Sequence, residues 1–235
     1  MTTNYGTKYG GWRIPADTVL DGTSLVISAG VGEDISFDLA IQSRFGCDIR
    51  LFDPTDRAVK HLEEVKEYYL NRDPSIFKGG IQPDYIRTIE RLQPDLSKLH
   101  MNPIGLWNKA DTLKFYKQTN PAYVSQTLIP DMFGENYTTV PVARLSDLLR
   151  ERGLSDRPIS LLKMDIEGAE IEVLETLLED RIYPQILCVE FDYLLKKVDK
   201  THRTEKIIKA LTDVGYTTVC NDNWNICFRH TLPNH

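Results

Sequence analysis

The stretch LVISAGVGEDISFD, residues 25–38, passes from an apolar run into a turn with two glycines and then into a segment rich in acids. A short apolar run followed by such a turn and by an amphipathic segment predicts a buried strand over 25–29 and a helix over 35–45. Gly30 and Gly32 permit a tight turn and let a ligand approach the backbone. The stretch therefore predicts a site for a nucleotide-like ligand at the end of a strand.

Apolar strand-like runs alternate with amphipathic helix-like segments along the rest of the chain. We expect strands at 47–53, 98–107, 111–116, 159–165, 186–192, 216–221 and 225–230, and helices at 56–69, 85–92, 146–152, 169–179 and 202–214. This alternation predicts an α/β fold in which helices cover both faces of a parallel sheet. Because no repeat or low-complexity linker interrupts the pattern, we expect one domain over 1–235, with an N-terminal arm at 1–22 and loop-rich insertions at 71–95 and 117–137.

The composition argues against several classes of partner. The formal net charge is −6 and the basic residues are scattered, whereas binding to a nucleic-acid backbone needs a basic patch. No run approaches the ~20 apolar residues of a membrane span, and the first residues lack the apolar core of a signal peptide. The cysteines are too widely spaced for a CxxC pair, which indicates free thiols: Cys47, Cys188, Cys220 and Cys227. We expect a cytoplasmic protein with no nucleic-acid partner and no membrane span.

Acids follow three of the other predicted strands, namely Asp53, Asp165 and Glu190. In an open parallel sheet the carboxyl ends of the strands lie at one edge, where ligands bind. An acid after the second strand is placed to accept hydrogen bonds from both hydroxyls of a ribose, which is the role we expect for Asp53. A glycine turn combined with such an acid serves two classes of ligand, dinucleotides and S-adenosylmethionine.

The residues after Gly32 favour the second class. A dinucleotide fingerprint requires a small residue where Ile35 stands, and Glu33 and Asp34 would face a diphosphate. Carboxylates repel a diphosphate and attract the sulfonium and ammonium groups of S-adenosylmethionine. An NAD(P)-dependent oxidoreductase is kept as the alternative.

The segment LLKMDIEGAEIEVLE, residues 161–175, predicts a buried strand that ends at Asp165 and leads into a helix. The spacing leaves two roles open for its first acids. Asp165 and Glu167 either cap the helix N-terminus, where carboxylates are stabilised, or take part in chemistry.

Five stretches together resemble the FkbM family of S-adenosylmethionine-dependent methyltransferases: SAGVGEDISFD, LFDPTDRA, NPIGLW, LLKMDIEGAE and CVEFD. The resemblance extends over residues 9–229. It implies a Rossmann-like class I methyltransferase fold, a mostly parallel seven-stranded sheet with one antiparallel strand near the C-terminus. It also implies that S-adenosyl-L-methionine gives its methyl group to a hydroxyl of a sugar, a polysaccharide precursor or a secondary metabolite, leaving S-adenosyl-L-homocysteine.

The resemblance assigns donor contacts position by position. They are Ser28, Gly30, Gly32, Glu33, Asp34 and Ser36 at the turn, Asp53 at the ribose, Asn102, Ile104 and Gly105 around the adenine, and Asp165 at the methionine end. The chain departs from the common pattern at Ser28, where that pattern has an acid, and at Asp34, where it has a glycine. Which carboxylate touches the methionine part of the donor stays open.

Transfer to a hydroxyl also removes a proton, so a general base is expected. We expect Asp165 to be this base or to position the acceptor, with Glu190 beside it and His202 as a further catalytic candidate. His202 also suits the start of a helix without any catalytic role. A non-catalytic member of the fold is a further alternative.

Two groups of residues keep alternative roles. Asp165, Glu167, Glu190 and Asp192 offer the oxygen ligands that a divalent metal such as Mg²⁺ prefers, but no metal site is predicted. The aromatic residues of the N-terminal arm either stack on a sugar or pack over the sheet edge: Tyr5, Tyr9 and Trp12. The expected partner is a small-molecule or glycan acceptor that contacts the insertions, and a homo-oligomer is compatible with the sequence.

Overall fold

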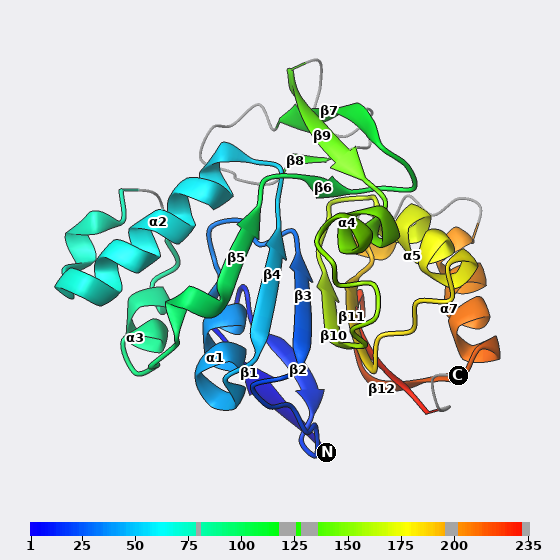
Figure 1. The fold of residues 1–235 in the computed structure, drawn as a ribbon, viewed down its shortest axis with the longest axis horizontal. Coiled ribbons are helices and arrows are strands. Elements are labelled where there is room, and N and C mark those ends of the chain that lie inside the picture. Colours follow the sequence, from blue (N-terminus) through cyan, green and yellow to red (C-terminus); the bar gives the residue numbers. More distant parts are fainter. Residues whose placement is uncertain (79–80, 118–125, 128–135, 196–201, 232–235) are drawn as a thin grey trace.

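The computed structural model describes residues 1–78, 81–117, 126–127, 136–195 and 202–231. Within them, a central sheet of seven strands runs in the order β12-β13-β11-β10-β3-β4-β5 (Figure 1). The strands are β3 (Leu25–Ala29), β4 (Asp48–Phe52), β5 (Leu99–Asn102), β10 (Ile159–Met164), β11 (Ile186–Glu190), β12 (Tyr216–Asp222) and β13 (Asn225–His230). β13 pairs antiparallel with β11 and β12, and the other neighbouring pairs are parallel. The predicted mostly parallel seven-stranded sheet is thereby confirmed.

Helices cover both faces of this sheet because successive residues of a strand point to opposite sides. One face carries α1 (Ser36–Phe45), α2 (Asp56–Asn71), α3 (Tyr85–Ile89) and the short 3₁₀ helices η1 (Pro74–Ile76) and η2 (Leu96–Lys98). The other face carries α4 (Leu145–Glu151), α5 (Glu170–Glu179) and α7 (Arg203–Asp213), while α6 (Asp192–Leu195) follows β11. Along β3, Leu25, Ile27 and Ala29 pack on the side of α4, α5 and α7, and Val26 packs on the side of α1 and α2. No helix within the described residues is long and apolar enough to cross a bilayer.

The N-terminal arm forms a hairpin that the sequence pattern did not predict. β1 (Thr2–Tyr5) and β2 (Trp12–Pro15) pair antiparallel, and β2 lies against β11 and β12. Trp12 and Ile14 are buried in the core on the side of α1. Each strand has only four residues, which is too short to show the alternation of apolar and polar residues that identifies a strand. The burial of Trp12 agrees with the expectation that the arm packs over the sheet edge.

A second, smaller sheet stands above the carboxyl ends of the central strands (Figure 1). Its order is β6-β9-β7-β8, formed by β6 (Gly105–Leu106), β7 (Asp111–Lys117), β8 (Gln126–Thr127) and β9 (Tyr137–Ala143). The strand expected over 98–107 is therefore divided between the two sheets, with Pro103 at the break, because proline has no N–H to give to a strand ladder. Most of the insertion expected at 117–137 lies outside the described residues.

The remaining boundaries differ little from prediction. The helix expected over 85–92 ends at Ile89, because the chain leaves the helix in a turn that Leu92 closes by donating to the Ile89 carbonyl. The helices expected to start at residues 35 and 169 begin one residue later, with Ile35 and Ala169 at their N-caps.

Candidate active site

The turn after β3 passes directly over the residue that follows β10. Gly30 has φ +69°, and a β-carbon there would lie 1.6 Å from the carbonyl oxygen of Asp165. Gly32 also has positive φ, +54°, but a β-carbon there would meet no atom within 4 Å. Gly30 is thus required by contact with the protein, whereas the backbone at Gly32 faces open space in which a ligand can approach it.

Asp53 lies at this turn, as predicted, but each oxygen of its carboxylate already accepts two hydrogen bonds from the protein. Oδ2 accepts hydrogen bonds from the backbone N–H groups of Val31 and Gly32, both at 3.0 Å. Oδ1 accepts from the N–H of Thr55 at 2.9 Å and from its hydroxyl at 2.6 Å. A carboxylate offers about four acceptor positions. Asp53 therefore shapes the turn, and a ribose hydroxyl would have to replace one of these donors, of which the rotatable Thr55 hydroxyl is the easiest to displace.

The two acids of the turn also have protein partners. Glu33 pairs with the guanidinium of Arg57 on α2 at 2.5 Å. Asp34 accepts from the Thr7 hydroxyl at 2.6 Å and from the N–H of Ser36 at 3.0 Å. Arg57 offsets the charge of Glu33, so the predicted repulsion of a diphosphate is weaker than the sequence indicated. Ser36 is buried, and its hydroxyl accepts from the N–H of Thr7, which places it beneath the N-terminal arm.

A buried lysine that the sequence prediction missed supports the turn from below. Lys163 of β10 is 5% exposed, and its ammonium donates to the carbonyl of Gly30 at 2.5 Å and to that of Ala29 at 3.4 Å. Asp38 lies fully buried nearby, where burial raises the pKa of its carboxyl to about 6 against the opposing charge of Lys163. Ser28 is fully buried beside Asp38, so it lies under the turn and not on its open side. A lysine within an otherwise apolar strand is the signal that could have identified this group.

The residues expected around the adenine follow β5. Asn102 is 8% exposed; its amide donates to the carbonyls of Leu51 and His100, and its oxygen accepts from Arg152 at 2.7 Å. All of these bonds hold protein groups in place. Ile104 and Gly105 lie where the chain passes from the central sheet to the small sheet, and Gly105 pairs with Val142. Their contact with a donor stays a prediction.

Asp165 and Glu190 come together because β10 and β11 are parallel neighbours. Met164 and Val189 are opposite each other in the register, so the two acids follow or end adjacent strands at the same edge. The side chain of Asp165 is 35% exposed and its N–H donates to the Ala29 carbonyl. Burial raises the pKa of Glu190 to about 8, and the charges of Asp165, Asp192 and Glu167 add to the effect. Glu190 therefore keeps its proton at neutral pH.

A second carboxylate pair lies behind the first. Glu170, at the start of α5, is fully buried and accepts a hydrogen bond from the N–H of Gly168 at 2.9 Å. Burial and the charge of Asp192 raise the pKa of Glu170 well above its ordinary value. Burial and a neighbouring like charge both disfavour the ionised form, so Glu170 favours its protonated state. Among the described residues, no set of three or more His, Cys, Asp or Glu side chains is arranged to hold a metal ion.

His202 is not brought to these acids. It is the N-cap of α7 with φ +53°, its side chain is 71% exposed, and its ring lies 3.4 Å from the carboxylate of Glu205. The catalytic role considered for His202 therefore has no support in the geometry. The residues just before it, 196–201, lie outside the described part of the chain.

A groove of about 920 Å³ lies at the opposite edge of the central sheet. Its lining includes Arg157 and Ile159 at the start of β10 and Arg181 to Tyr183 after α5. Because Ile159 begins the strand that Asp165 follows, the groove is separated from the candidate site by the length of β10.

The sequence model of the Methyltransferase FkbM domain matches residues 23–218. No curated protein matches the sequence. Among solved structures, PH0793 of Pyrococcus horikoshii, which carries a provisional assignment as a transferase, matches with a TM-score of 0.35 and 11% identity, over 97% of this chain and 70% of that one. A structural similarity at this level supports no conclusion about function.

Proposed function

Because the chain belongs to the FkbM family of methyltransferases, whose domain spans residues 23–218, we propose that it methylates a hydroxyl group with S-adenosylmethionine as donor. The acceptor is a sugar, a polysaccharide precursor or a secondary metabolite. One observation carries the proposal: the glycine turn after β3 and the acid after β10 touch at one edge of the sheet, at Gly30 and Asp165. This contact supports a donor site at the turn with the reacting group beside it.

The residues present fit the donor. The open side of Gly32 leaves room for it, and Asp53 can exchange the Thr55 hydroxyl for a ribose hydroxyl while it still holds the turn. Carboxylates near this edge favour a cationic donor. When bound, S-adenosylmethionine supplies a methyl group on a positively charged sulfur.

Glu190 and Asp165, the two acids at this edge, have different roles toward the acceptor. Glu190 is protonated below pH about 8, so its carboxyl group donates a hydrogen bond that orients the acceptor. Asp165, the more open of the two, accepts the proton that the acceptor hydroxyl loses. Alignment of acceptor and donor lowers the barrier further. The small sheet above the edge provides a wall of the acceptor site. The insertion at 71–95, which was also expected to contact the acceptor, packs through η1 and α3 against α2 and α1.

Calorimetric titration tests the donor. We expect the protein to bind S-adenosylhomocysteine and to show no heat with NADH; binding of NADH without S-adenosylhomocysteine would favour the oxidoreductase alternative. The matched variant is Asp53→Ala, which removes the anchor of the turn and should abolish binding. A protein that binds neither compound would contradict the proposal and favour the non-catalytic alternative.

A further inference from the structure

Residues 6–11, with the sequence GTKYGG, join β1 to β2 and precede the family domain, yet they are bonded to the donor turn. The hydroxyl of Thr7 donates to Asp34 Oδ2 at 2.6 Å, and the N–H of Thr7 donates to the Ser36 hydroxyl at 2.8 Å. The same Thr7 hydroxyl accepts from the N–H of Gly10 at 2.9 Å. Thr7 is 3% exposed, so this network is part of the folded interior.

The backbone of this loop fits closely against the turn. A β-carbon on Gly10 would lie 2.5 Å from Asp34 Cγ, and one on Gly6 would lie 2.9 Å from the N–H nitrogen of Phe37. A third bond, from the N–H of Lys8 to Asp84 at 3.2 Å, attaches the other side of the loop to the start of α3. Glycine is needed where another segment approaches this closely. The loop is therefore held at its position from two directions.

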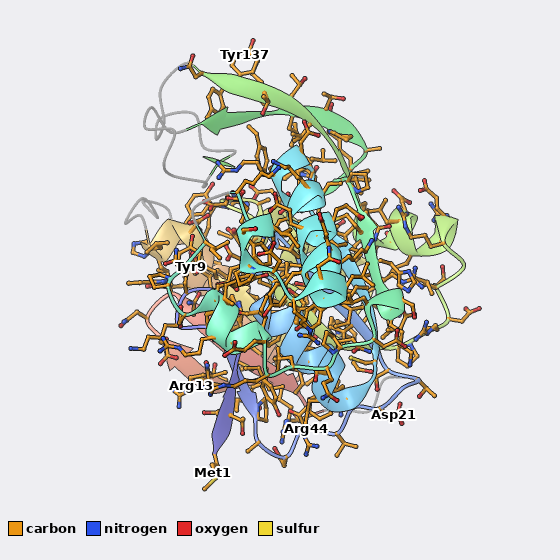
Figure 2. The ribbon with its side chains drawn as sticks, turned by 90° about the vertical axis from the view of Figure 1, so that its left-hand side faces the viewer. Met1, Tyr9, Arg13, Asp21, Arg44 and Tyr137 are labelled. Carbon is orange, nitrogen blue, oxygen red and sulfur yellow. The ribbon has the colours of Figure 1, made fainter. Side chains whose placement is uncertain are left out.

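Tyr9 is at the tip of the loop. It lies at the surface, between the N-terminal hairpin below it and the small sheet above it (Figure 2). The residue is 61% exposed. The pKa of its phenol is raised by partial burial and by the carboxylates of Asp165, Glu167 and Glu190. The phenol thus stays neutral, and Tyr9 stands between Thr7 and Gly10, both of which contact Asp34 of the turn.

We propose that residues 6–11 form one wall of the methyl-donor site: Thr7 positions the donor turn through Asp34, and Tyr9 closes the site beside Asp165 and Glu190. The inference rests on the proposed function. It assigns a binding role to a segment that precedes the family domain. The family resemblance assigned no donor contact to these residues. Thr7 is a positioning residue, because it acts on the donor through Asp34.

The test is the affinity for S-adenosylhomocysteine, measured by calorimetry beside the melting temperature. Thr7→Val removes a hydrogen bond to a charged group, and we expect about tenfold weaker binding. Thr7→Ser keeps the hydroxyl and should restore binding to nearly the wild-type value, which a purely structural role of the threonine methyl would not do. Thr3→Val, on the exposed face of β1, is the matched control and should bind as the wild type does.

A second variant keeps the test decisive if Thr7→Val fails to fold. The exposed ring of Tyr9 is not needed for packing, so Tyr9→Ala should melt like the wild type while binding S-adenosylhomocysteine about threefold or more weakly. Leu70→Ala, at another exposed apolar side chain, is its control. In the wild type, S-adenosylhomocysteine should also slow amide hydrogen exchange in residues 6–11.

The outcomes separate the two proposals. Wild-type binding with unchanged affinities of Thr7→Val and Tyr9→Ala, and unchanged exchange in residues 6–11, would overturn the role of the loop and leave the proposed function standing. Absence of wild-type binding would overturn the proposed function and the loop's role with it.

Discussion

The carbonyl oxygen of Asp165 lies 1.6 Å from the position that a β-carbon of Gly30 would occupy. The proposed donor turn and Asp165, the proposed base, are therefore fixed relative to each other by backbone contact, without a side chain between them. Lys163 reinforces this contact from below by donating to the Gly30 carbonyl. The two reacting molecules would be aligned by the sheet itself.

Gly30→Ala should disrupt the fold at this contact. Both the positive φ and the clash with Asp165 disfavour alanine, and we expect the free energy of unfolding to fall by roughly 3 kcal/mol or more. Denaturant unfolding measures it. Gly22→Ala is the control, because a β-carbon there would make only ordinary contacts, the nearest at 3.7 Å. Equal stability of the two variants would contradict the geometry.

Lys163→Met should lower both stability and donor binding. Removal of the buried ammonium leaves the Gly30 carbonyl without its donor and Asp38 without its nearest opposite charge, which we expect to cost about 2–4 kcal/mol in the free energy of unfolding. Lys60→Met, at a lysine whose side chain is 69% exposed, should change it by less than about 0.5 kcal/mol. If Lys163→Met unfolds at the wild-type denaturant concentration, the lysine does not support the turn.

Asp165→Asn should lower methyl transfer without loss of the donor. The amide keeps the shape but cannot take the proton, so we expect the rate to fall by about 10²–10⁴-fold while the affinity for S-adenosylhomocysteine changes by less than about threefold. Release of S-adenosylhomocysteine in the presence of an accepted substrate is the measurement. Near-normal turnover would remove Asp165 as the base.

Stability should depend on pH through Glu190. Its pKa is raised in the folded state, from 4.5 to about 8, so the folded protein binds the proton more tightly than the unfolded chain does. Protonated Glu190 therefore favours the folded state. This contribution to the free energy of unfolding is fully present at low pH and is lost as the pH rises from 4.5 to about 8. Glu190→Gln removes this loss and should be more stable than the wild type at pH 8 by about 1–2 kcal/mol, with no gain near pH 4.

The control for this series is Glu67→Gln, at an exposed position of α2, which should follow the wild-type curve of unfolding free energy against pH. A parallel dependence in Glu190→Gln and the wild type would assign the effect to other groups, of which the buried Glu170, whose pKa is also raised, is the first candidate.

The sequence predicted those elements whose burial produces a local pattern of apolar residues. β3, β10 and β11 are mostly apolar runs, and Gly30, Asp165 and Glu190 at their carboxyl ends fall at one edge, as the parallel topology requires. The resemblance to the FkbM family, which the match over residues 23–218 confirms, added the antiparallel β13. These predictions needed only the chain order and the strand period.

The parts that were missed depend on contacts between distant residues. Arg57 forms an ion pair with Glu33, which is 24 residues away in the sequence. Thr7 donates a hydrogen bond to Asp34, which is 27 residues away. Neither pairing has a signature in the sequence. Lys163 and Glu170 lie in apolar surroundings where a charged residue is rare. Only the tertiary structure identifies the Gly30 carbonyl that accepts from Lys163 and the Gly168 N–H that donates to Glu170.

Among the described residues, β13 comes last in sequence but lies inside the sheet, between β11 and β12. During synthesis, β12 has no strand of the central sheet to pair with until Asn225–His230 has been made, because its pairing in the sheet is with β13. A chain that stops early would leave the edge of β11 open, and an open apolar edge invites pairing with another molecule. A chain that ends before Asn225 should therefore aggregate or be degraded, and not accumulate as a folded protein with reduced turnover.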